Sequence, residues 1–140
     1  MVSKIFLDVN VLLDFFLKRT GFESVEQILL SAKKRKVKLY VSPSILQTCS
    51  YYMQRSFDTQ TCKLLLLEFL KLVNIIESSQ ESILQALKSP IEDIEDAIHY
   101  FTALTHEIDY LISSDKQFQR AAMSNLPVMG IEEINKILSY

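Results

Sequence analysis

The chain has 140 residues, 49% of them hydrophobic and 23% charged, which is an ordinary globular composition. A chain of this length buries about two-thirds of its unfolded surface, and its two glycines and three prolines exclude a long flexible linker, so we expect residues 1–140 to form one domain. The net charge of -2 excludes a basic, nucleic-acid-binding surface spread over the whole molecule.

Apolar runs alternate with segments of helical periodicity along the chain. Ser42-Pro43 predicts a helix start, because serine caps helices well and proline suits the first helical position, whereas Ser89-Pro90 predicts a break. In chain order we expect a strand at 5–7, helices at about 10–20 and 23–36, a strand at 37–41, helices at about 43–55 and 58–71, a strand at 73–76, helices at 79–87 and 94–107, a strand at 110–112, a helix at 116–123, a strand at 127–129 and a helix at 131–138.

Strands separated by helices predict crossover connections, and therefore a mostly parallel sheet covered by helices on both faces. The expected class is α/β. Ligands of such sheets bind at the carboxyl ends of the strands, so acidic residues that follow strands are candidate functional residues.

Four aspartates fit this rule. Asp8 directly follows the first strand, and Asp115 follows the fourth strand after Ser113 and Ser114. Asp93 and Asp96 are three apart at the start of the intervening helix, so both carboxylates can lie on one helix face. If the strands are parallel neighbours, the four acids gather at one edge of the sheet.

Carboxylates crowded in this way repel one another unless a cation neutralises them, and Mg²⁺ prefers such hard oxygen ligands. Each acid also has a simpler interpretation, because Asp8 or Asn10, Asp93 and Asp115 all stand where helix caps are expected. Acids at two strand ends together with a pair on the helix between them favour a metal site over capping alone.

Other polar features give weaker predictions. Lys33, Lys34, Arg35, Lys36 and Lys38 form a local basic cluster that either contacts phosphates or is a solvated helix end. His99 and His106 are seven residues apart, beyond the spacing of a zinc pair, so we expect helix-surface or partly packed residues rather than ligands.

The chain has no pattern for export or for crossing a membrane. Residues 64–73 are the most apolar run, but Glu68 and Lys71 interrupt it well short of the ~20 residues that a membrane span needs. Cys49 and Cys62 form no CxxC pair, which predicts two reduced thiols packed as small hydrophobic groups. We expect a soluble, cytoplasmic protein without a membrane partner.

Four segments, taken together in order and spacing, resemble those of the PIN-domain family, which includes many bacterial VapC-like toxins. They are the D-x-N segment at 6–13, the Ser-Pro segment at 41–46, the acidic helix start at 93–100 and the strand end at 109–115. The resemblance implies a three-layer α/β/α fold and a divalent-metal ribonuclease that uses Mg²⁺ or Mn²⁺.

The resemblance also assigns residues and partners. Asp8, Asp96 and Asp115 would bind the metal, and Asp93 would be an additional catalytic acid. Within the site, Asn10 would order the first loop and Ser113 would form hydrogen bonds. RNA would be the substrate, and an antitoxin protein or a second copy of the chain would be a partner.

The chain departs from the family pattern at Thr48, because the second segment normally carries a glutamate at that position. A hydroxyl is a weak, neutral ligand, so the expected metal site has one charge fewer. The alternative to a ribonuclease is therefore a degenerate PIN fold that binds RNA or protein without cutting it.

Two other classes with an acid after the first strand fit less well. A haloacid-dehalogenase-like phosphatase needs a second aspartate where this chain has Asn10, and a receiver domain needs adjacent acids where Val9 follows Asp8.

Overall fold

The computed structural model describes residues 2–138, so residues 1, 139 and 140 of the expected domain lie outside it. The predicted order of strands and helices is confirmed. The strands are β1 (Ser3–Leu7), β2 (Val37–Val41), β3 (Val73–Ile75), β4 (Tyr110–Ile112) and β5 (Val128–Met129). The helices are α1 (Val9–Phe16), α2 (Phe22–Lys33), α3 (Pro43–Met53), α4 (Thr59–Phe69), α5 (Gln80–Lys88), α6 (Ile94–Thr105), α7 (Lys116–Ala121) and α8 (Ile131–Leu138).

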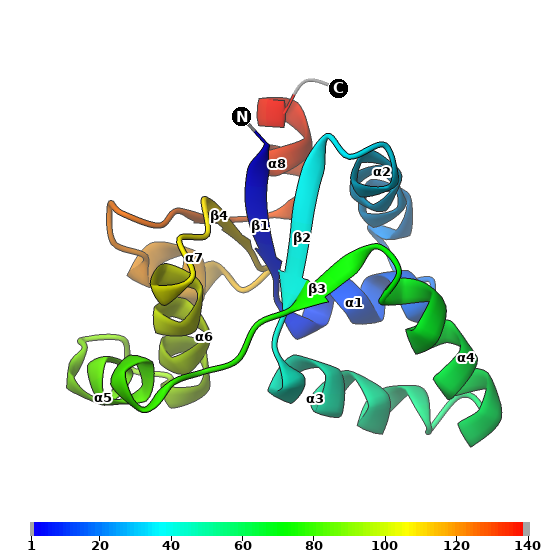
Figure 1. The fold of residues 1–140 in the computed structure, drawn as a ribbon, viewed down its shortest axis with the longest axis horizontal. Helices are drawn as coiled ribbons and strands as arrows, with labels where there is room; N and C mark the ends of the chain where they lie inside the picture. Colours follow the sequence, from blue (N-terminus) through cyan, green and yellow to red (C-terminus); the bar gives the residue numbers. More distant parts are fainter. Residues whose placement is uncertain (1, 139–140) are drawn as a thin grey trace.

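The five strands form one parallel sheet in the order β3-β2-β1-β4-β5 (Figure 1). The chain first builds outward from β1 through β2 to β3, and then returns to add β4 and β5 on the other side of β1. The direction of building therefore reverses between β1 and β4, and in open α/β sheets ligands bind in the crevice at such a point.

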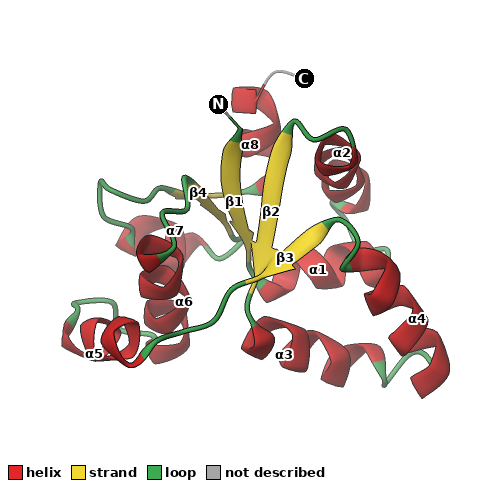
Figure 2. Cartoon of the chain, viewed as in Figure 1, coloured by secondary structure: helices red, strands yellow, loops and turns green. Residues whose placement is uncertain are grey.

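Helices cover both faces of the sheet (Figure 2). α2 packs against α1, α8 and β2 on one side, whereas α5 and α6 pack on each other on the opposite side. The central strand is buried on both faces, since Ile5, Phe6 and Leu7 are all inaccessible to solvent. The predicted α/β/α class with a parallel sheet is confirmed.

Several helices end earlier than predicted, because three non-glycine residues reverse the chain in the left-handed conformation. α1 stops at Phe16 rather than near Thr20, since Lys18 has a φ of 50° and the Arg19 N–H donates to the Asp14 carbonyl. Arg35 and Glu107 end α2 and α6 in the same way. Of the two glycines, both within residues 2–138, Gly21 has a positive φ, of 100°.

The remaining bounds differ from the prediction by at most two residues. α3, α4 and α7 end at residues 53, 69 and 121, α5 spans 80–88, and β3 and β5 are each one residue shorter. Both cysteines are buried and unbonded to each other, as predicted, and burial raises the pKa of the Cys49 thiol to about 12. No helix within residues 2–138 is long and apolar enough to cross a membrane.

Candidate active site

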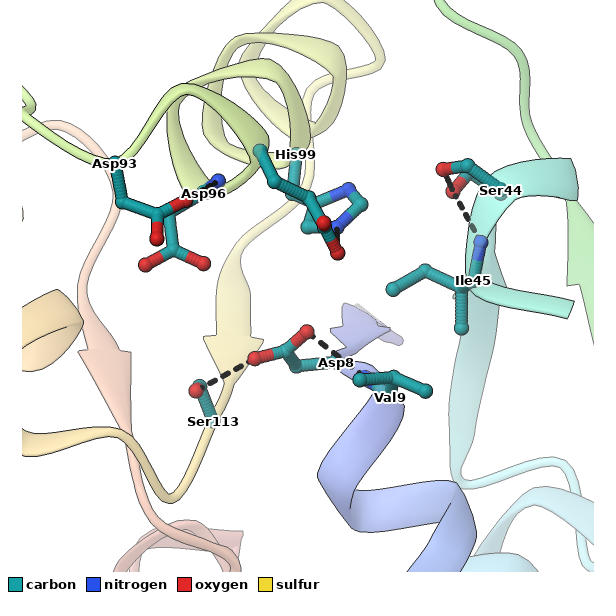
Figure 3. Close-up of polar contacts among 10 residues, drawn as sticks. Asp8, Val9, Ser44, Ile45, Asp93, Asp96, His99 and Ser113 are labelled. Atoms are coloured by element: carbon teal, nitrogen blue, oxygen red, sulfur yellow. Dashed lines mark hydrogen bonds and ion pairs between the residues drawn. The ribbon is translucent and has the colours of Figure 1, made fainter. Parts of the chain in front are cut away.

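Asp8 lies where the direction of sheet building reverses. It follows β1 and is the N-cap of α1, with a side chain that is only 5% exposed. Its Oδ1 accepts a hydrogen bond of 2.8 Å from the Val9 N–H, and its Oδ2 accepts one of 2.7 Å from the Ser113 hydroxyl (Figure 3). Both oxygens are held, so the carboxylate has one orientation at the edge of the sheet.

Ser113 joins the acid after β1 to the acid after β4. Its fully buried hydroxyl donates to Asp8 and accepts from the Asp115 N–H at 3.2 Å. Asp115 caps α7, where its Oδ1 accepts from the N–H groups of Gln117 at 2.9 Å and Phe118 at 3.3 Å. A single hydroxyl therefore bridges Asp8 and the backbone of Asp115.

The other two acids come from the start of α6. Asp93 is its N-cap and accepts a 3.0 Å hydrogen bond from the Asp96 N–H. Figure 3 shows the Asp96 side chain pointing toward Asp8 from the opposite side of the crevice. Within residues 2–138 the Asp96 carboxylate accepts no hydrogen bond.

The four acids lie near one another at this edge of the sheet, whereas their catalytic and metal-binding roles stay predictions. The pKa of Asp96 is raised to about 7, first by burial and then by the negative charges of Asp93, Asp8, Asp115 and Glu95. The predicted convergence is therefore correct. The capping interpretation is correct as well, because Asp8, Asp93 and Asp115 each cap a helix whose N-terminus faces this edge.

For two residues assigned by resemblance, Asn10 and Thr48, no contact in the structure supports the expected role. Asn10 lies in the first turn of α1 and is half-buried, and its side chain makes no hydrogen bond within residues 2–138, so its ordering role stays a prediction. Thr48 is half-buried in the second turn of α3, and its relation to the metal also stays a prediction.

His99 was predicted to be a surface or partly packed residue, and this is wrong. It is 2% exposed, and its ring lies 6.1 Å from that of Phe6 on β1. Spacing along a helix shows which residues share a face, but it does not show that this face of α6 packs on the central strand. One sequence signal was available: His99 follows Asp96 by three residues, so the two share a helix face, and Asp96 was already expected to face the sheet edge.

A surface hollow of about 330 Å³ adjoins the acids. Its lining includes Asp93 and Asp96 from the start of α6, and Gln117, Phe118 and Arg120 from α7. A larger hollow, of about 550 Å³ beside Asp14 and Gly21, contains none of the four acids. The candidate site is therefore identified by its cluster of acids and not by the volume of the hollow, and the 330 Å³ hollow is the space beside those acids.

The donor set fits a hard divalent cation that keeps part of its water shell. Among residues 2–138, no three histidine, cysteine, aspartate or glutamate side chains are already spaced to hold one metal ion. Mg²⁺ does not require such a cage, because it binds proteins through one or two carboxylates and several waters. Burial and then the charges of the neighbouring acids raise the pKa of Asp96, and a cation beside the cluster would offset that repulsion.

Acids that follow β1 and β4, two neighbouring strands of a parallel sheet, define an α/β protein with an acidic site at the carboxyl ends of its strands. The family model of the PIN domain matches residues 4–117, which include all four acids. The chain belongs to the PIN-domain family. Among curated proteins, no sequence relative matches it.

Solved structures show the same fold at low sequence identity. VapBC2 from Rickettsia felis, bound to a promoter DNA fragment, has 19% identity and a TM-score of 0.70, covering 90% of this chain and 97% of that one. VapC20 from Mycobacterium tuberculosis, a sarcin-ricin-loop-cleaving toxin, has 12% identity and a TM-score of 0.68, with 88% and 98% covered. A toxin–antitoxin complex from Klebsiella pneumoniae has 22% identity and a TM-score of 0.65, with 87% and 94% covered.

Proposed function

We propose that the chain hydrolyses phosphodiester bonds of RNA with Mg²⁺ or Mn²⁺ held by Asp8, Asp96 and Asp115, with Asp93 beside them. The observation that carries the proposal is the meeting of these four acids, in a PIN-domain chain, where the direction of sheet building reverses. A divalent cation at such a site supplies an activated water and offsets negative charge that develops on the phosphodiester.

The chain's own residues divide the work between fixed and adaptable groups. Asp8 is held by Val9 and Ser113, and Asp115 is held by the first turn of α7, so both present oxygens at fixed positions. Asp96 accepts no hydrogen bond within residues 2–138 and can turn toward a ligand. In the metal-free protein its raised pKa lets it keep a proton near neutral pH, which limits the repulsion among the acids.

The test is cleavage of a labelled single-stranded RNA by purified protein in Mn²⁺, in Mg²⁺ and in excess chelator. We expect cleavage only with metal, and we expect Asp8→Asn to lower the rate by roughly 100-fold. Glu26→Gln removes an exposed charge on α2, a helix that carries none of the four acids, and should leave the rate unchanged. Equal rates for wild type and Asp8→Asn would mean that the cleavage comes from a contaminant.

Thr48 favours a second candidate function, a module that binds RNA without cutting it. That reading predicts a metal-independent gel shift of the same RNA and no product after prolonged incubation with Mn²⁺. Metal-dependent cleavage that Asp8→Asn abolishes rejects it.

We also propose an antitoxin protein as a partner, since two of the similar solved structures are toxin–antitoxin assemblies. A small reading frame beside the gene, co-expressed with this chain, should co-purify with it and suppress cleavage. A homodimer is proposed from the resemblance alone, and light scattering on the purified chain measures it directly.

A further inference from the structure

His99 is a buried polar side chain that lacks a hydrogen bond. It is 2% exposed, and within residues 2–138 its Nε2 has no hydrogen-bond partner. Buried polar groups without partners are rare in native proteins and call for an explanation. The nearest candidate partner is Oε1 of Glu95, which lies 3.5 Å from Nε2 without forming a hydrogen bond.

The contact places Glu95 at the site. Figure 3 shows His99 on the side of α6 that faces Ser44 and Ile45, at the start of α3. The Glu95 carboxylate, held next to this ring, is one of the charges that raise the pKa of Asp96. Its side chain is 66% exposed, so a ligand can reach it from solvent.

By the resemblance, this is also the side on which the family's fourth carboxylate would lie. The second family segment lies on α3, and Thr48 occupies the position of its glutamate. α6 and α3 begin on either side of Asp8, so an acid at the start of α6 faces the helix that carries Thr48.

We propose that Glu95 is a further divalent-cation-binding residue that takes over the role of the absent second-segment glutamate, and that His99 is the positioning residue that holds it. The proposal rests on the proposed function. A glutamate side chain has three rotatable bonds, so a neighbouring imidazole that restricts its rotamers lowers the entropy lost on binding a cation. Groups that orient a metal ligand are typically worth 10–100-fold in affinity.

A helix contact without a role in metal binding is the competing explanation. Glu95 and His99 are four apart on one helix, and pairs with that spacing add little to helix stability. In that case neither residue affects metal binding. Melting temperature therefore does not separate the two explanations, whereas metal affinity does.

The experiment is calorimetric titration of the metal-free full chain with Mn²⁺. We expect Glu95→Gln to weaken Mn²⁺ binding roughly 10-fold or more, while Glu26→Gln leaves it unchanged. Adding Thr48→Glu to Glu95→Gln should restore affinity, because it moves the carboxylate back to α3. The exposed position of Glu95 makes it tolerant of substitution, and melting curves in chelator verify the fold of every variant.

His99 is tested by its dependence on Glu95. His99→Leu should weaken Mn²⁺ binding in the wild-type background and have no further effect in the Glu95→Gln background, because it acts only through that carboxylate. His99→Gln keeps a side-chain donor and should retain most of the affinity. Additive effects of His99→Leu and Glu95→Gln would overturn the positioning role.

Failure of the inference and failure of the proposed function give different results. A wild-type chain that binds no Mn²⁺ at millimolar concentration overturns both. A wild-type chain that binds Mn²⁺, with Glu95→Gln binding equally well, overturns only the role of Glu95. Affinity lost in Glu95→Gln but not restored by Thr48→Glu rejects the replacement of the α3 glutamate.

Discussion

Asp96 lies at the most crowded point of the acidic cluster, and its protonation links the site to stability. Its pKa rises from an ordinary value of 3.8 to about 7, through burial and then through four neighbouring acids. Between these values the folded protein binds more protons than the unfolded chain. The free energy of unfolding therefore falls as pH rises from about 4 to 7. Below about pH 4 the group is protonated in both states and adds no further pH dependence.

We expect Asp96→Asn to stabilise the metal-free protein at pH 8 and to leave its stability at pH 4 nearly unchanged. The gain should be about 1–2 kcal/mol, allowing for the partial exposure of Asp96 to solvent. Urea unfolding in excess chelator at pH 4, 6 and 8 measures it. Parallel pH dependences for the two proteins would show that the Asp96 carboxyl is not strained by its neighbours.

Metal should reverse the order of stability. A cation that binds only the folded state adds about 2.7 kcal/mol when its concentration is 100 times the Kd. We therefore expect Mn²⁺ to raise the melting temperature of the wild type and to have a much smaller effect on Asp96→Asn. A wild type that melts at the same temperature with Mn²⁺ as with chelator would argue for the degenerate fold.

At the scale of elements, helix starts were predictable because local chemistry sets them. Ser42, Asp93 and Asp115 all cap the helices that their sequence positions indicated. Helix ends were less predictable, since Lys18, Arg35 and Glu107 adopt a conformation usually taken by glycine. The order of strands depends on contacts remote in sequence, and so does the burial of His99 on Phe6.

The long-range contacts of α6 include one hydrogen-bonding centre that fixes the loop before β5. The buried Tyr100 hydroxyl lies 2.8 Å from the Leu126 carbonyl and 3.1 Å from that of Met123, and it accepts from the Met123 N–H at 2.9 Å. One hydroxyl thereby ties the connection between α7 and β5 to the helix that carries Asp96.

We expect Tyr100→Phe to lower the free energy of unfolding by about 1–3 kcal/mol, because it leaves buried backbone groups without a partner. Denaturant unfolding measures the change, and the exposed Tyr52→Phe is the matched control. A loss no larger than that of the control would show that water replaces the hydroxyl.

Over the whole molecule, charge is distributed unevenly with respect to the site. The basic cluster of residues 33–38 lies around the amino end of β2, whereas the acids lie at the carboxyl ends of the strands. A five-residue strand spans roughly 16 Å, so the cluster is remote from the acids. The structure favours the solvated-helix-end interpretation, since Lys33 lies in the last turn of α2 and residues 33–36 are exposed.

Arg120 is the better candidate for an RNA contact, because it lines the hollow that Asp93 and Asp96 also line. We expect Arg120→Gln to weaken binding of single-stranded RNA roughly 3- to 10-fold. It should also reduce the slope of log affinity against log salt by about 0.7, the amount for one lost phosphate contact. Binding is measured by fluorescence anisotropy in an Asp8→Asn background, which keeps the RNA intact.

The matched control removes more charge at the remote end. Lys34→Gln with Lys36→Gln lowers the net charge by two, whereas Arg120→Gln lowers it by one. If RNA responds to the overall charge of the molecule, the double variant should be the weaker binder. If RNA lies in the hollow beside the acids, Arg120→Gln should be weaker and the double variant should keep nearly the wild-type slope. Greater loss in the lysine variant would place the RNA path along the amino end of the sheet, away from Asp96.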